Sequence, residues 1–175
     1  SMSAPSQDQA IKLLAQDCNM QYFQDYIEIY PDDDPTYFDK RANYIKAGKV
    51  YQPDLKFSLV GNKFPKDLMS DIVVNGETLK ALNTSDPLIY DKVANWWYKM
   101  TEGFYQRGVS TEILNVVNEP DLNTPDRKNH YGLNGDTKEA VARVFKYAVP
   151  KYKAMFANPA INTLKMKTPL IMGPS

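Results

Sequence analysis

The chain has 175 residues, of which 43% are hydrophobic and 12% aromatic, so it is long enough for one domain with a buried core. The 21 basic and 21 acidic residues give a formal net charge of +0, which excludes a global field that would attract nucleic acid or an anionic membrane. A lone cysteine, Cys18, and a lone histidine, His130, exclude an internal disulfide and a cysteine- or histidine-rich metal site within one chain. Neither a metal nor an organic cofactor is therefore expected.

The first nine residues are expected to form a flexible start, and residues 10–175 a single domain. Ser1 and Met2 resemble the residue pair that expression tagging leaves behind. No apolar run approaches the roughly 20 residues of a membrane-spanning helix, and no signal peptide is visible. A targeting segment could have preceded this sequence, so the localisation stays open.

The first third of the chain predicts a helix, a strand and a second helix. Residues 10–16 have the apolar spacing of a short helix, and residues 20–30 are rich in aromatic and β-branched side chains, as strands are. The acidic run that ends at Asp34 could bind calcium, but a helix cap at Asp34 followed by Pro35 in the first turn is the better interpretation. The helix is expected to end at Gly48.

A strand is predicted next at residues 55–60, and Asn62 lies just beyond its carboxyl end. The connection from Pro65 to Ser85 is too long for a tight loop. It contains Asn75-Gly76, a dipeptide that favours a hairpin turn. A small hairpin or lid over a site is therefore expected here.

A strong amphipathic helix is predicted from the Asp86 cap and Pro87 to Gly108. Its apolar stripe includes one of the two tryptophans, Trp96 or Trp97, which should lie in the core. The other tryptophan could stack on a sugar, although a residue in the middle of a helix more often packs inside the protein.

Residues 113–117 have the length and β-branched content of a buried strand. Pro120 cannot continue a strand ladder, so Asn118 and Glu119 are expected at the carboxyl end of this strand. Chemistry in α/β folds is placed at that end, which makes this stretch the candidate reaction site.

The last third predicts one more helix and one more strand. Asp136 and Glu139 have the spacing of a capping box ahead of an amphipathic helix, which Pro150 should kink or end early. Residues 170–172 read as a final strand.

Alternating strands and helices of this kind build an α/β fold with a parallel sheet. The prediction is a partial (half) TIM (β/α)8 barrel with about four parallel strands alternating with helices. The alternative, an open doubly wound sheet, normally carries a glycine-rich phosphate loop, and none of the 8 glycines forms one.

The sequence Val116-Val117-Asn118-Glu119-Pro120-Asp121 resembles the Asn-Glu-Pro motif on the fourth strand of a clan of retaining glycoside hydrolases with (β/α)8 barrels. The preceding helix that ends in Arg107-Gly108-Val109 and the final Gly173-Pro174-Ser175 are similar to the agarase/porphyranase and xylosidase/iduronidase families within that clan. The similarity of pattern covers roughly residues 20–175.

The resemblance implies that Glu119 is the general acid/base and that Asn118 binds the sugar hydroxyl beside the reacting carbon. Burial and a neighbouring carboxylate are the physical means by which such a glutamate stays protonated near neutral pH. Asn62 and His130 are candidate substrate contacts, although a lone histidine in a loop is more often simply solvated. The alternative interpretation is that Asn118-Glu119-Pro120 only marks the point where the chain leaves the strand and has no catalytic role.

The sequence departs from the clan at two points. Val117 stands where many members carry tryptophan, which favours an outlying group such as the agarases. The clan's nucleophile is a second glutamate on the seventh strand, and this chain ends at the fifth. Asp25 and Glu28 lie on the first strand and Asp121 is too near Glu119 in sequence, so none is a convincing nucleophile.

Two functional hypotheses follow. In the first, the chain is the N-terminal half of a polysaccharide-degrading barrel that lacks its nucleophile and is inactive alone, with export favoured by such a substrate. In the second, it is a non-catalytic half-barrel that binds carbohydrate or assembles as a structural module. Both leave the outer strands open to pair with the missing half or with a second copy. Neither involves nucleic acid or a membrane.

Overall fold

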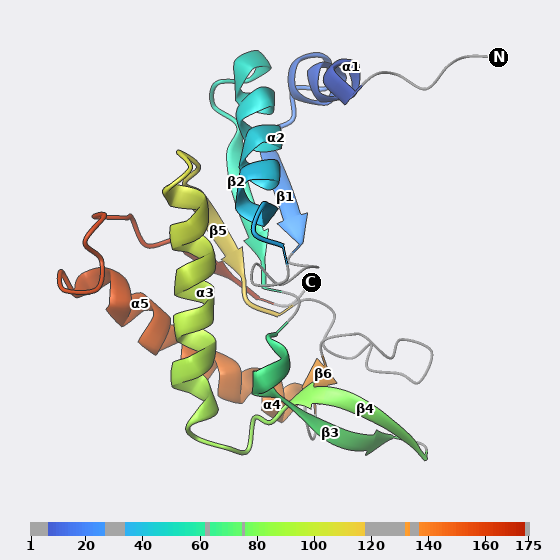
Figure 1. Ribbon diagram of the computed structural model, residues 1–175, viewed down its shortest axis with the longest axis vertical. Coiled ribbons are helices and arrows are strands. Elements are labelled where there is room, and N and C mark those ends of the chain that lie inside the picture. Colours follow the sequence, from blue (N-terminus) through green and yellow to red (C-terminus); the bar gives the residue numbers. More distant parts are fainter. Residues whose placement is uncertain are drawn as a thin grey trace.

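The computed structural model describes residues 7–26, 34–61, 64–74, 76–117, 132–133 and 137–173 (Figure 1). Its main sheet has four strands in the order β1-β2-β5-β7, and every neighbouring pair is parallel. Strand order thus follows chain order, as it does for consecutive strands of a (β/α)8 barrel, and the predicted alternation of strands and helices is confirmed. The four strands are β1 (Tyr22–Tyr26), β2 (Lys56–Val60), β5 (Thr111–Asn115) and β7 (Leu170–Met172).

Helices connect the parallel strands, and a second, smaller sheet interrupts two of the connections. The small sheet has the order β3-β4-β6, with β3 and β4 antiparallel and β4 and β6 parallel. Its strands are β3 (Met69–Val74), β4 (Glu77–Leu82) and β6 (Gly132–Leu133). The helical elements are α1 (Gln7–Lys12), η1 (Leu13–Asp17), α2 (Tyr37–Tyr51), η2 (Lys66–Leu68), α3 (Ile89–Tyr105), α4 (Thr137–Arg143), η4 (Val144–Ala148) and α5 (Val149–Ala157). Within the described ranges, no helix is both long and apolar enough to cross a membrane.

The hydrophobic core lies between one face of the parallel sheet and the helices. Phe57 on β2 packs against Phe104 on α3 with ring centroids 4.8 Å apart, and Leu59 points to the same face because it lies two residues further along the strand. Both side chains are fully buried. Burying a side chain of this size stabilises the fold by roughly 1.5–3 kcal/mol relative to leaving it exposed. This row of strand side chains therefore fixes how α3 sits on the sheet.

The opposite face of the sheet is partly open at its last strand. The register pairs Asn115 with Met172 and Ile113 with Leu170, so these side chains share the face that points away from the helices. Leu170 is 72% exposed and Met172 37% exposed. Both side chains are therefore open to solvent on this face of β7.

The start of α2 differs from the prediction, because the N-cap is Thr36 and the helix begins at Tyr37, while Asp34 lies in the turn that precedes it. The Asp34 carboxylate accepts hydrogen bonds from the hydroxyl and the backbone N–H of Thr36, at 2.6 and 2.9 Å. These bonds lower the pKa of the Asp34 carboxyl below its usual value. The predicted end at Gly48 is wrong, because α2 continues to Tyr51. Gly48 is instead buried in the helix, where a Cβ would lie 2.8 Å from the Leu55 side chain.

Helix α3 has the predicted apolar stripe and the predicted glycine-based ending. The Asp86 carboxylate accepts the backbone N–H of Leu88 ahead of the helix. At the other end, Val109 N–H bonds the carbonyl of Phe104 and Gly108 N–H bonds that of Tyr105, with Gly108 at φ +77°. This is the bonding pattern of a Schellman motif, which needs a left-handed residue at the position of Gly108.

Replacing Gly108 with alanine should lower the free energy of unfolding by about 1 kcal/mol, because a Cβ is unfavourable at positive φ. Urea unfolding followed by circular dichroism measures the change. Gln106→Ala is the matched control, since Gln106 is exposed and already has helical dihedral angles. Equal stability of the Gly108→Ala protein and the wild type would contradict the assignment.

The last helical region runs without a break from Thr137 to Ala157 but contains a π-helical turn, η4, directly before Pro150. Pro150 was predicted to kink or end the helix. The helix instead continues through Pro150 and contains the π turn, because a wider hydrogen-bonding pattern accommodates a residue that has no N–H to donate. The buried side chains recur at intervals of four, which a wider turn keeps on one face: Ala140, Val144, Ala148, Tyr152 and Phe156.

A buried hydroxyl pair joins this helix to α3. The hydroxyls of Tyr152 and Thr101 lie 2.9 Å apart, and the Thr101 hydroxyl also donates to the carbonyl of Trp97 at 3.0 Å. Burial raises the pKa of Tyr152 well above its ordinary value, so the phenol stays neutral in the fold. The pair satisfies polar groups that would otherwise be costly to bury.

A pH dependence follows from this raised pKa. Tyr152 contributes its full stability below its unfolded pKa, about 10, and loses it as the pH rises toward the folded pKa, by up to about 1.4 kcal/mol per pH unit. The difference in unfolding free energy between wild type and Tyr152→Phe should therefore shift in favour of phenylalanine between pH 9 and pH 11. Chemical denaturation across that range measures it. A difference that does not change with pH would contradict the buried, neutral phenol.

Candidate functional site

The carboxyl ends of the four parallel strands meet at one edge of the main sheet, and the sequence motif follows directly from that edge. Strand β5 ends at Asn115, and the described chain continues through Val116 and Val117, the residue before Asn118. The strand predicted at residues 113–117 is therefore present, displaced by two residues. In parallel α/β sheets this edge is where binding and catalytic groups are placed.

The side chains that the sequence singled out lie outside the described residues. This applies to Asn118, Glu119, Asn62 and His130. The structure does describe the residues that lead into the two asparagines and the glutamate, namely Gly61 before Asn62 and Val117 before Asn118.

Backbone hydrogen bonds extend the ladder past the strand ends. The N–H of Gly61 donates to the carbonyl of Asn115 at 2.7 Å, and the N–H of Val116 donates to the carbonyl of Met172 at 3.5 Å. The ends of β2, β5 and β7 are therefore joined to one another where the chain leaves the sheet. The segments that begin at Asn62 and Asn118 start from neighbouring points.

Trp97 of α3 supports this joined edge from the helix side. Its side chain is fully buried, and a Cβ placed on Gly61 would lie only 2.8 Å from its Nε1 atom and 3.3 Å from the Asn115 carbonyl oxygen. Only glycine lets the backbone approach the indole this closely. The position of Trp97 thereby sets the position of both strand ends.

Asn115 is a polar residue of the site that the sequence analysis did not single out. Its side chain is fully buried at the last position of β5, on the face that points away from the helices, in register with Val60 and Met172. The available signal was its place as the lone polar residue in the run from Ile113 to Val117. A buried amide in such a run is costly unless it is held by partners, so it marks a position with a specific role.

Asp25 was considered as a second carboxylate and set aside, and its surroundings agree with that interpretation. It is 5% exposed on β1, paired in register with Leu59 and hence on the helix-facing side of the sheet. Its Oδ1 atom lies 3.1 Å from a guanidinium nitrogen of Arg41 on α2. The carboxylate is therefore committed to an ion pair between strand and helix. Among the described residues, no group of three or more histidine, cysteine, aspartate or glutamate side chains gathers as a metal site would require.

The small sheet lies beyond the carboxyl ends of the parallel strands (Figure 1). The hairpin of β3 and β4 confirms the turn predicted at Asn75-Gly76, and Gly76 has the positive φ of +82° that such turns require. Strand β6, which lies between the motif and α4 in sequence, pairs with the end of β4 through Ala81 and Leu82. The hairpin and the segment after the motif are therefore parts of one sheet.

Side chains strengthen the connection between the end of β4 and α4. Arg143 donates to the Thr84 hydroxyl at 3.1 Å, and the hydroxyl of Tyr90 donates to the carbonyl of Thr84. Burial raises the pKa of Tyr90, which keeps this donor protonated. The residue that leaves the hairpin is thus fixed to the helices α3 and α4.

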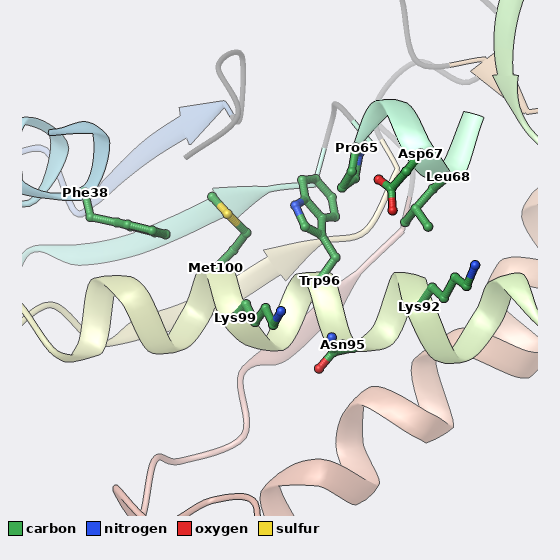
Figure 2. A pocket seen from close by; sticks show the side chains of 9 residues that line it. All are labelled: Phe38, Pro65, Asp67, Leu68, Lys92, Asn95, Trp96, Lys99 and Met100. Carbon is green, nitrogen blue, oxygen red and sulfur yellow. The ribbon is translucent and has the colours of Figure 1, made fainter. Parts of the chain in front are cut away.

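A groove of about 470 Å³ lies elsewhere, on the outer side of the helices (Figure 2). Figure 2 shows α3 along one side, with Phe38 of α2 at one end and the residues of η2 at the other. Trp96 lies in this groove but is only 8% exposed, and its ring packs 5.8 Å from that of Phe64. Both tryptophans therefore serve the core, and the alternative of a sugar-stacking tryptophan on α3 is not supported. The groove is lined by Phe38, Pro65, Asp67, Leu68, Lys92, Asn95, Trp96, Lys99 and Met100.

Substituting Gly61 with alanine should destabilise the protein by about 1–3 kcal/mol, the usual cost of overpacking, because the new methyl group would overlap the Trp97 indole. Thermal or urea unfolding measures the loss. Gly173→Ala is the matched control at the same edge, where the nearest atom to an added Cβ, on Phe145, is 4.0 Å away. If both variants unfold like wild type, the close approach of Gly61 to Trp97 is wrong.

Comparison with known proteins identifies the fold at a distance. No protein-family model matches the chain, and no curated protein matches it significantly. Six chains of solved structures do match. One is SrfJ from Salmonella typhimurium, with 15% identity and a TM-score of 0.59 over 97% of this chain and 39% of its own. Another is the endo-beta1,6-glucanase BT3312, with 14% identity and a TM-score of 0.60 over 98% of this chain and 40% of its own.

At these identities the likeness concerns the fold alone. The chain spans about two fifths of the length of each of the two structures. Since one of them is an endo-glucanase, a fold related to that of a glycoside hydrolase is in keeping with the four parallel strands and their order. The chain thus has an α/β fold that is distantly similar to the folds of these two structures.

Proposed function

We propose that this chain is the N-terminal half of a (β/α)8 glycoside hydrolase that cleaves O-glycosidic bonds in a polysaccharide. The proposal is supported by the position of Asn118-Glu119-Pro120 in the sequence, three residues after β5 ends at Asn115, in a sheet of four parallel strands that follow one another in chain order. β5 is the third of these four strands, one place earlier than the fourth strand that carries the motif in the glycoside hydrolase clan. The carboxyl end of a barrel strand is where a catalytic carboxylate is expected. The distant likeness to an endo-glucanase supports the same class.

In this proposal Glu119 acts as general acid and then as general base. It gives its proton to the glycosidic oxygen while a second carboxylate attacks the anomeric carbon, so the bond to the leaving sugar breaks as a glycosyl–enzyme ester forms. Glu119 then takes a proton from water while the water oxygen attacks the anomeric carbon. The ester bond breaks and the second carboxylate is released. Asn118 binds the hydroxyl beside the reacting carbon, a hydrogen bond that strengthens in the transition state.

The nucleophile of the proposed reaction comes from outside this chain. A retaining mechanism needs two carboxyl groups about 5–5.5 Å apart. Asp25 does not serve, because it faces the helices and pairs with Arg41. A glutamate on a later strand of the complete barrel would supply the second carboxylate.

The exposed face of β7 supports completion of the sheet by further strands. Leu170 and Met172 are exposed on the side that would become the barrel interior, and β1 and β7 each pair with one neighbour in the described sheet. The same feature favours a second candidate function, a non-catalytic half-barrel that binds carbohydrate and assembles with another copy of itself. The two candidates differ in activity, since only the first predicts turnover of a polysaccharide that depends on Glu119.

The proposal predicts that Glu119→Gln in the full-length gene product lowers turnover of the natural polysaccharide by about 10²–10⁴-fold, the usual contribution of general acid–base catalysis. Reducing-sugar release from β-1,6-glucan, agarose, porphyran and xylan gives the rates. Formation of the glycosyl–enzyme from a dinitrophenyl glycoside should be affected far less, because that leaving group needs no proton.

Asp121→Asn is the matched control, since it removes one negative charge two residues away. It should keep most of the wild-type rate. Polysaccharide turnover that survives Glu119→Gln unchanged would rule out the acid/base assignment. Equal losses on the polysaccharide and on the dinitrophenyl substrate would point to a structural effect of the substitution instead.

A further inference from the structure

The hairpin of β3 and β4 presents a row of four side chains to solvent. The register places Asp71 opposite Lys80 and Val73 opposite Thr78, so all four share one face of the hairpin. All four are exposed, and Val73 is 74% exposed. Successive pairs along the hairpin are separated by two residues, roughly 7 Å. Asp71, Val73, Thr78 and Lys80 are called the hairpin face below.

The hairpin face is held beside the segment that follows the motif. Two residue pairs join β4 to β6, and Arg143 of α4 binds Thr84 just after β4. The antiparallel pairing of β3 and β4 extends from Met69 to Leu82, so the hairpin is continuous with these anchored residues. A molecule bound on the hairpin would therefore lie on the small sheet, which is found beyond the carboxyl ends of the parallel strands (Figure 1).

The chemistry of the hairpin face suits an uncharged polyhydroxylated chain. The Asp71 carboxylate and the Lys80 ammonium group lie 2.6 Å apart and balance each other, so the face attracts neither anions nor cations strongly. Each still has capacity for further hydrogen bonds, and Thr78 can both donate and accept. Val73, opposite Thr78 and two residues along the strand from Asp71, adds an apolar side chain suited to the C–H surface of a sugar ring.

We propose that the hairpin face is a binding surface for a neutral polysaccharide, and that it guides the chain toward the edge where β5 ends. The identification of that edge as catalytic rests on the proposed function, but binding to the hairpin does not. The hairpin would act on affinity for long substrates rather than on the chemical step. Its residues touch the polymer some distance from the bond that is cleaved.

The test is affinity electrophoresis of this chain through native gels that contain linear β-1,6-glucan, xylan or agarose. The wild type should be retarded by at least one of them. In the double variant Val73→Ser/Lys80→Ala the dissociation constant should rise by about fivefold or more, the effect of losing a hydrogen bond and an apolar contact. The variant should fold, because an exposed ion pair contributes little to stability.

Val50→Ser/Lys46→Ala on α2 is the matched control, because Val50 is 75% exposed and Lys46 is exposed. It should migrate like wild type in every gel. Equal retardation of the two double variants, or passage of the wild type unhindered through all three gels, would overturn the proposal. Affinity electrophoresis measures binding and the Glu119→Gln assay measures turnover, so a failure of the hairpin proposal and a failure of the acid/base proposal give different results.

Discussion

The contact between the Trp97 indole and the backbone at Gly61 fixes the carboxyl edge of the parallel sheet. The indole is fully buried, so α3 cannot slide along the sheet without opening a cavity or overlapping Gly61. Gly61 in turn bonds Asn115, and Val116 bonds Met172. Through these links one helix side chain fixes the ends of three strands. The strand that precedes the motif is therefore held at its end by backbone hydrogen bonds on both sides.

The second sheet adds a different kind of constraint at the same edge. A segment that follows a parallel strand can usually vary in length, but here β6, which comes after the motif in sequence, pairs with a hairpin inserted between β2 and α3. Two connections that lie far apart in sequence are thereby made to share one structure. Changes in the hairpin and in the segment after the motif must be compatible with each other.

Much of the fold could be predicted because its elements have simple periodicities. The stripe of α3 and the strand at residues 170–172 followed from apolar spacing, and the hairpin followed from Asn75-Gly76. Gly48 was misread, because a glycine chosen for close packing against Leu55 looks in the sequence like one chosen for a left-handed helix end. The fully buried Asn115 was overlooked, since a polar residue inside an apolar run gives no sign of which face it occupies. The role of the motif was inferred from its resemblance to a known family, and the acid/base role of Glu119 stays a prediction.

The π turn η4 has a consequence for comparing this chain with its relatives. A π turn holds one more residue than an α-helical turn, and each residue turns a helix by about 100°. The two halves of the helix, Thr137–Arg143 and Val149–Ala157, thus keep one buried face only because of that extra residue. A relative with a regular helix here would be one residue shorter, and a residue-by-residue alignment that lacks this gap would be out of register beyond it.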